Sequence, residues 1–144
     1  VTGVQTCALP ISGNIWTNPG EIAGNGVDDD GNGYVDDTWG WDFWNNDNNP
    51  SDDNGHGTHT AGTVGARGNN GVGVTGVNWN VSMVALKIGS ANGSISVSAA
   101  VSALNYCVTK GVKVSNHSWG GGSVSSALDA AITSARNAGH LMIC

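Results

Sequence analysis

Positive charge is scarce in this chain, and it is absent from the part that precedes Arg67. The 144 residues include five Lys and Arg against eleven Asp and Glu, and the net charge is −6. Ten of the acids lie between Glu21 and Asp53, a stretch without any Lys or Arg, so its formal charge is −10. Such a block repels phosphate groups, and we therefore expect no nucleic-acid partner.

Cysteines and long apolar runs are also few. Cys7, Cys107 and Cys144 make an odd number at no metal-ligand spacing, which predicts neither a disulfide framework nor a zinc site. No apolar run reaches the roughly 18 residues that a membrane-spanning helix needs, so we expect no membrane partner. Residues 1–12 have no cationic start before their short apolar part, as a signal peptide would.

Charged residues make up only 11% of the chain, whereas 39% of its residues are hydrophobic. Together with periodic apolar segments, this composition predicts a packed globular core rather than extended disorder. Glycine is abundant, with 23 residues at no regular period, which indicates many tight turns and close backbone approaches.

The chain divides into three parts by composition. Residues 1–12 share no pattern with the remainder, and we interpret them as an extraneous segment. Residues 13–50 are rich in Asn, Asp and Gly with scattered aromatic residues, which is typical of a long ordered loop held by side-chain hydrogen bonds. Aromatic residues such as Trp41 and Phe43 argue against a solvated acidic tail.

After residue 56 the pattern alternates between helix and strand. The predicted elements are a helix at 57–66, a strand at 81–88, a helix from 96 to Gly111, a strand at 112–116, a helix around 127–135, and a strand from 141. This order predicts parallel βαβ units whose helices cover the sheet. Ligands bind such sheets beyond the carboxyl ends of the strands, which directs attention to the polar segment 116–120.

Residues 28–36 match the first nine positions of a calcium-binding loop with the spacing D-x-[DN]-x-[DN]-G. Alternate side chains of this spacing converge on one ion, and hard oxygen ligands suit calcium. The candidate ligands are Asp28, Asp30, Asn32, the backbone carbonyl of Tyr34, and Asp36. The twelfth position holds Trp39 in place of a bidentate Glu, so a calcium loop here has another geometry. A cluster of Asx turns with solvated carboxylates is the alternative.

His56 and His59 lie three residues apart at a predicted helix start. A zinc site is disfavoured, because no glutamate completes an H-E-x-x-H arrangement and no cysteine is near. General-base chemistry suits His56 better, since a histidine at a loop-to-helix junction is exposed enough to accept a proton from a nucleophile. For His59, His117 and His140 we expect structural roles.

The stretch from Asp53 to Gly62, DNGHGTHTAG, closely resembles the histidine motif of subtilisin-like serine proteases. Two other segments support the resemblance. GNGVDDDGNGYVDD followed by WGWDF is similar to the calcium-loop insertion of bacterial subtilases, and VSNHSWGG at 114–121 is similar to their V-I-N-x-S-x-G-G segment. The resemblance covers roughly residues 13–143.

The resemblance implies a three-layer, subtilisin-like α/β fold in which helices flank a parallel β-sheet, incomplete in this chain. Residues 13–144 would form part of a peptidase domain. It also implies hydrolysis of a polypeptide substrate through an acyl-enzyme, with His56 as the general base. A structural Ca²⁺ ion and a secreted, monomeric parent protein belong to the same expectation.

The resemblance also implies substrate contacts. It places Ser118, Trp119 and Gly120 in the primary specificity cleft, where their backbone would pair with an extended substrate. Gly93 and Ser94 match the segment that lies along the other side of the substrate. Recognition by an added strand needs exposed backbone, which the many glycines permit.

Two members of the implied catalytic triad have no counterpart in the sequence. The family order is Asp, His, Ser, yet no Asp precedes Asp28. Asp37 is rejected as a substitute, because it lies inside the calcium-loop match and not on an apolar strand. The family's A-G-N and G-T-S-x-A segments are absent as well. We therefore expect an internal fragment that is inactive as given, with a calcium-dependent binding or structural module as the alternative.

Overall fold

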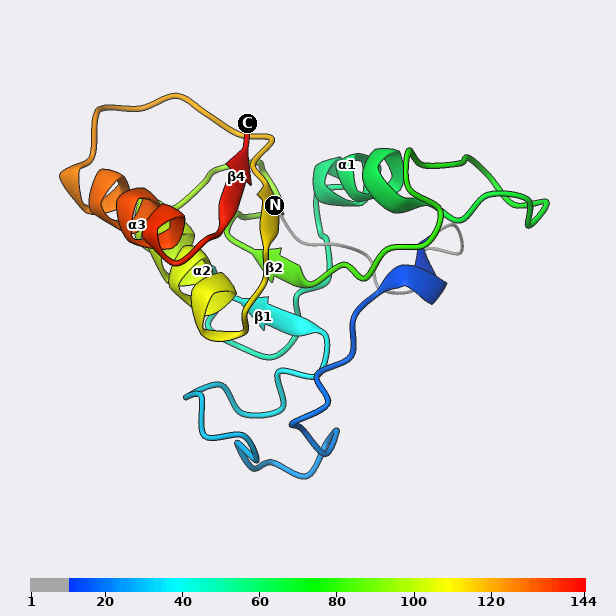
Figure 1. Ribbon diagram of the computed structural model, residues 1–144, viewed down its shortest axis with the longest axis horizontal. Coiled ribbons are helices and arrows are strands. Elements are labelled where there is room, and N and C mark those ends of the chain that lie inside the picture. Colours follow the sequence, from blue (N-terminus) through cyan, green and yellow to red (C-terminus); the bar gives the residue numbers. More distant parts are fainter. Residues whose placement is uncertain (1–10) are drawn as a thin grey trace.

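The computed structural model describes residues 11–144, which form alternating helices and short strands (Figure 1). In chain order the elements are the 3₁₀ helix η1 (Ser12–Asn14), β1 (Gly40–Asp42), α1 (His56–Gly65), β2 (Ala85–Lys87), α2 (Val97–Thr109), β3 (Val114–Asn116), α3 (Ser126–Asn137) and β4 (Leu141–Ile143). The helices and strands predicted after residue 56 are confirmed, although β2 is shorter than the apolar run that predicted it.

All strand pairing among these elements is parallel. β1 pairs with β2 in the register Gly40 to Ala85, and β3 pairs with β4 in the register Val114 to Leu141. The unit β3–α3–β4 is thus a βαβ unit of the expected kind. β1 was not predicted, because its three residues lie within an irregular, polar stretch and offer no periodic pattern.

The side chains of β2 alternate between two helical layers. Ala85 packs in one cluster with Ala61 and Ala66 at α1, whereas Leu86 and Ile88 pack in another with α2. A third cluster joins α2 to α3. α1 therefore lies on one side of the strands while α2 and α3 lie on the other, as Figure 1 shows. The predicted three-layer α/β class is confirmed.

Serine residues cap the starts of α2 and α3, and glycine residues follow their ends. The hydroxyl groups of Ser96 and Ser125 each accept a hydrogen bond from the amide three residues later, at 3.3 Å. Gly111 and Gly139 follow the helix ends with positive φ angles of 68° and 80°. Local sequence signals therefore set the ends of α2 and α3.

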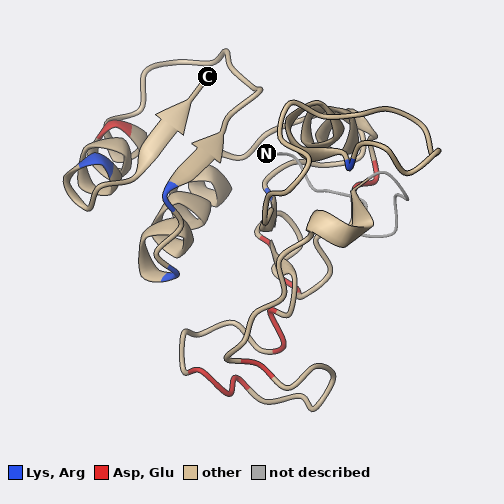
Figure 2. Ribbon diagram, turned by 45° about the vertical axis from the view of Figure 1, so that its right-hand side comes forward, with Lys and Arg blue, Asp and Glu red and all other residues tan. Residues whose placement is uncertain are grey.

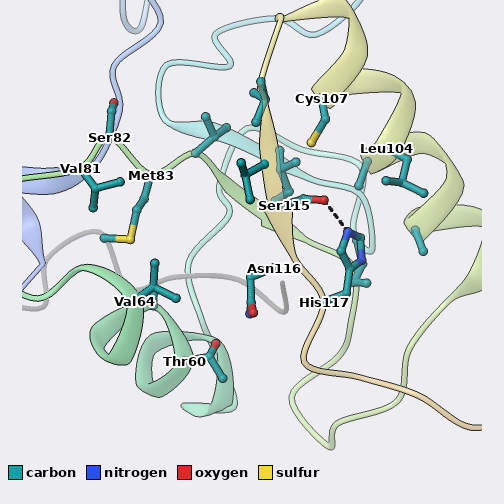
Figure 3. A pocket seen from close by; sticks show the side chains of 18 residues that line it. Thr60, Val64, Val81, Ser82, Met83, Leu104, Cys107, Ser115, Asn116 and His117 are labelled. Atoms are coloured by element: carbon teal, nitrogen blue, oxygen red, sulfur yellow. Dashed lines mark hydrogen bonds between the residues drawn. The ribbon is translucent and has the colours of Figure 1, made fainter. Parts of the chain in front are cut away.

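Within residues 11–144, β2 and β3 are not hydrogen-bonded to each other, so the strands form two separate pairs. A cavity of about 240 Å³ lies between them and is largely apolar. α1 contributes Thr60 and Val64 to its walls, α2 contributes Leu104, and the end of β3 contributes Asn116 and His117 (Figure 3). The cavity thus brings α1 and the carboxyl end of β3 to one place.

Residues 1–10 of the segment interpreted as extraneous lie outside the described residues. Ile11 is 1% exposed and packs with Ala61, Ala66 and Ala85. The extraneous origin of residues 1–12 stays a prediction.

Cys107 is buried on α2 and is not in a disulfide, as is common for a small core residue. No helix in the range 11–144 is both long and apolar enough to cross a bilayer.

Gly40 occupies a backbone position that a side chain would disrupt. Its φ angle is 127°, and an added Cβ would collide with the backbone carbonyl of Ala85 on β2. We expect Gly40→Ala to lower the free energy of unfolding by about 3 kcal/mol, through strain and separation of the two strands. Urea denaturation of the complete polypeptide that carries this chain measures the loss.

Gly111→Ala is the matched control for Gly40→Ala. Gly111 has a φ angle of 68°, but its Cβ would meet open space. Its substitution should therefore cost only the strain of a left-handed residue, about 1 kcal/mol. Equal losses for the two variants would show that the contact with Ala85 is unimportant.

Candidate active site and metal loop

The loop before α1 is organised by a buried carboxylate. Asp52 is 7% exposed, and its Oδ1 accepts hydrogen bonds from the backbone amides of Asn54 and Gly55. Its Oδ2 accepts from the amide and the hydroxyl of Thr58, at 2.8 and 2.7 Å. Burial alone would raise the pKa of Asp52, but these hydrogen bonds lower it below its ordinary value. The charged carboxylate therefore caps the first turn of α1.

His56 is the first residue of α1 and is exposed. It follows Gly55, whose φ angle of 95° makes the turn into the helix. Ala61, Gly62 and Gly65 of the same helix are small and buried, so α1 packs closely against the rest of the fold. The backbone thus holds the imidazole of His56 at the surface, where a proton can be exchanged with a nucleophile.

The segment with Gly93 and Ser94 lies beside this histidine loop. The Asn54 side-chain amide donates to the carbonyl of Ala91 at 2.8 Å, across 37 residues. Gly93 closes a turn by donating its amide to the carbonyl of Ser90 at 2.9 Å, with a φ angle of 85°. Gly93 and Ser94 are both exposed, so their backbone is open to a ligand.

The segment with Ser118, Trp119 and Gly120 leaves the carboxyl end of β3. Ser118 and Gly120 are exposed, whereas Trp119 is half-buried and packs against the α2 cluster. The Asn116 side-chain amide donates to the Ser118 hydroxyl at 2.9 Å. Asn116 lines the same cavity as Thr60 of α1, which places this segment on the side of the molecule that carries the histidine motif.

A buried ammonium group ties the histidine loop to the strands. Lys87 at the end of β2 is 3% exposed and contacts Asp42 at 2.9 Å and Asp53 at 2.8 Å. Asp42 is itself 1% exposed, and it also accepts from the amides of Trp44 and Asn45. Burial alone would lower the pKa of Lys87, but the hydrogen bonds to Asp53 and Asp42 raise it. The sequence offered one signal for this contact, a lysine that ends an apolar strand.

The predicted calcium ligands are brought together only in part. Oxygen atoms of Glu21, Asp28 and Asp30 lie within 4.8 Å of one another, in the acidic loop shown in Figure 2. Glu21 was missed in the sequence because it lies seven residues before the recognised spacing. Its carboxylate accepts hydrogen bonds from the amides of Asp29, Asp30 and Asp36, so it is folded onto the loop.

The other three predicted ligands are engaged within the loop. The Asp36 carboxylate accepts from the backbone amides of residues 24–26 at 2.7 to 3.1 Å. The Asn32 side chain accepts from the Tyr34 amide and donates to Asp37. The predicted ligand of Tyr34 is its backbone carbonyl, whereas the Tyr34 ring packs against the rings of Trp41, Phe43 and Tyr106 and so fixes this part of the loop. These contacts also fit the alternative of Asx turns.

Two residues anchor this loop to α2. Asp37 is fully buried and accepts from the Tyr106 hydroxyl at 2.6 Å and from the side-chain amide of Asn18. The Lys110 ammonium donates to Asp30. Burial alone would raise the pKa of Asp30, but this bond helps to hold it below its ordinary value. Asp37 thus holds the loop in place.

Comparison with known proteins identifies the family. A sequence model described as the subtilase family matches residues 2–144. Subtilisin-like protease 1 of Plasmodium vivax is 36% identical over 141 residues, which cover 97% of this chain and 22% of that protein. Thermitase of Thermoactinomyces vulgaris is 36% identical over 104 residues, which cover 72% of this chain and 37% of thermitase. The chain belongs to the subtilase family.

A solved structure agrees with the sequence relatives. A cold adapted subtilisin-like serine proteinase superposes with a TM-score of 0.71 and 31% identity, and the match covers 98% of this chain and 42% of that one. The fold is therefore subtilisin-like. The chain spans only about a fifth of the length of the Plasmodium relatives that it matches.

We expect Lys87→Met to destabilise the protein strongly, because it leaves the buried Asp42 carboxylate without a counter-charge. Removing one partner of a buried ion pair typically costs about 3–5 kcal/mol. Lys113→Met is the matched control, since Lys113 is exposed and its removal should change stability by less than about 0.5 kcal/mol. Urea denaturation compares the two variants, and similar midpoints would contradict a structural role for the Lys87 ion pair.

Proposed function

We propose that this chain is part of a secreted serine endopeptidase that hydrolyses peptide bonds through an acyl-enzyme. The observation that carries the proposal is the position of His56, exposed at the start of α1 on a loop fixed by Asp52. Membership of the subtilase family supports it, because curated relatives are named as proteases. The proposed substrate is a polypeptide, and the proposed parent protein is a monomer.

His56 acts as the general base in this proposal. Its imidazole takes the proton of a serine hydroxyl as the oxygen attacks the substrate carbonyl, and then passes that proton to the leaving amine. The serine and the aspartate that orients the imidazole come from elsewhere in the complete polypeptide, since no residue of 1–144 matches their family motifs. The 144-residue chain alone should therefore be inactive.

Two exposed backbone segments would bind the substrate. Gly93 and Ser94 are joined to the histidine loop through Asn54, and Ser118 to Gly120 follow β3. Exposed backbone of this kind can pair with an extended peptide by adding it as a strand. Trp119 lines or narrows the proposed cleft.

We expect His56→Ala in the complete polypeptide to reduce the rate of casein hydrolysis by about 10³-fold or more, because the serine hydroxyl loses its base. His59→Ala is the matched control, as it removes a second exposed histidine of the same helix and should retain most activity. The measurement is the initial rate with casein at neutral pH.

Three results of this experiment would contradict the proposal. Unchanged hydrolysis by the His56→Ala variant would remove His56 from the mechanism. Hydrolysis by the isolated 144-residue chain that depends on His56 would show that the triad is complete within it. A wild-type polypeptide that binds calcium but hydrolyses nothing would favour the alternative, a calcium-dependent structural or binding module.

We further propose that the acidic loop binds a structural Ca²⁺ ion. The donor set fits, because Glu21, Asp28 and Asp30 converge and supply the hard anionic oxygens that calcium prefers. Among the described residues Lys110 is the cationic partner of Asp30, so the three carboxylates share little positive charge. Bound calcium would screen their mutual repulsion and stiffen the loop that precedes the histidine motif.

Glu21→Gln should weaken calcium binding by about tenfold, since it removes one anionic ligand while its remaining oxygen can still accept a backbone hydrogen bond. Isothermal titration calorimetry with CaCl₂ and the thermal shift on adding calcium both measure this effect. Asp129→Asn is the matched control, because Asp129 lies in the first turn of α3, outside the loop. Absence of heat and of thermal stabilisation in the wild-type protein would contradict the calcium proposal.

A further inference from the structure

A serine hydroxyl links two buried histidines at the strand pair β3–β4. The Ser115 Oγ lies 2.6 Å from His117 Nε2 and 2.7 Å from His140 Nε2. His117 and His140 are only 7% and 6% exposed. Figure 3 shows Ser115 and His117 side by side on the wall of the cavity between α1 and α2. These three side chains lie at the edge of a largely apolar cavity, where a buried charge is not stabilised by water.

The hydrogen bonds determine where the protons lie. His140 Nδ1 is 2.8 Å from the carbonyl of Val112, which can only accept, so Nδ1 carries the proton. In neutral His140 the Nε2 atom is then an acceptor, and the Ser115 hydroxyl must donate to it. His117 Nε2 must in turn donate to Ser115. The Nδ1 atom of His117 then carries no proton and has a free lone pair. This buried atom has no hydrogen-bond partner among the described residues.

A proton added to this group would lack any counter-charge. Within residues 11–144, no carboxylate lies within ion-pair distance of either imidazole. Cys107 of α2 lines the same cavity, and burial raises the pKa of its thiol to about 11, which keeps it neutral. The charged residues on the flanking turns, Lys113 and Arg136, are exposed. Burial correspondingly lowers the pKa of His117 to about 4.

His117 is the residue that directly precedes the proposed substrate segment. Its backbone amide donates to the carbonyl of Ile143 on β4 at 2.7 Å. Its ring contacts the Trp119 ring at a centroid distance of 5.6 Å. Because Trp119 packs in turn against the α2 cluster, movement of the His117 ring would remove a contact that holds Trp119, the central residue of 118–120.

We propose that Ser115, His117 and His140 form an acid-sensitive latch, which holds residues 118–120 in place while both imidazoles are neutral. The inference rests on the proposed function only in calling these residues a substrate segment. On acidification a proton from water binds the His117 Nδ1 lone pair. The ring gains one positive charge that has no counter-charge, so the imidazolium moves from the cavity wall into water. This movement breaks the hydrogen bond that His117 Nε2 donates to Ser115.

The pH range of the latch follows from the sign of the shift. A histidine in water has a pKa near 6.5, so the released form binds its proton at higher pH than the latched form, whose pKa is about 4. The latch is therefore fully stable above pH 6.5 and loses stability as the pH falls from about 6.5 toward 4.

Amide exchange followed by mass spectrometry tests this inference in the complete polypeptide. With intrinsic rates corrected for pH, we expect protection of residues 117–121 to fall by about tenfold or more between pH 7 and pH 4.5. His117→Met introduces an apolar side chain of similar length that cannot titrate. Most of the pH dependence of amide protection should therefore disappear in this variant. His59→Gln removes an exposed histidine on α1 and should behave like the wild type.

The kinetics of casein hydrolysis supply a second readout. Acidification should raise KM in the wild type and not in His117→Met. If the polypeptide proves inactive, the exchange experiment still decides the inference. Equal protection of the wild type at both pH values, or unchanged acid dependence in His117→Met, would overturn it.

Discussion

The distribution of charge is the constraint on which this structure depends. Ten carboxylates lie in a stretch that contains no Lys or Arg, so cations from later elements must hold that stretch to the fold. Lys87 reaches Asp42 and Asp53 from β2, and Lys110 reaches the acidic loop from α2. Both contacts join segments far apart in the sequence. Because Asp53 lies three residues before His56, the same electrostatic anchoring that folds the acidic stretch also positions the proposed base.

The sequence predicted those elements whose signals are local. α2 and α3 have apolar residues at helical spacing and a glycine just beyond the helix end, and these features were sufficient. β1 has no such signal, since its three residues become a strand only through pairing with β2. The separation of the strands into two pairs is also a tertiary property. The three-layer class could therefore be predicted, whereas the sheet order and the cavity could not.

The acidic loop shows why a motif predicts a ligand set only in part. Asp28, Asp30 and Asn32 have the calcium-loop spacing, but the same spacing also favours Asx turns, and each of these side chains accepts at least one backbone hydrogen bond. Such bonds orient a carboxylate without using all of its lone pairs, so turn and ion binding are compatible. Glu21 completes the convergent group by folding back over the loop, a contact that no local pattern could indicate.

Burial separates the roles of the histidines in this chain. The first turn of α1 presents His56 to solvent, where an imidazole can exchange protons near neutral pH, as a general base must. His117 does not meet that condition, since only 7% of it is exposed and its buried Nδ1 atom has no hydrogen-bond partner among the described residues. Burial lowers the pKa of His117 to about 4, so its imidazole is neutral at neutral pH. The polar network of Ser115, His117 and His140, beside the proposed substrate segment, can thus respond to acid while it remains separate from the proposed catalytic proton transfer at His56.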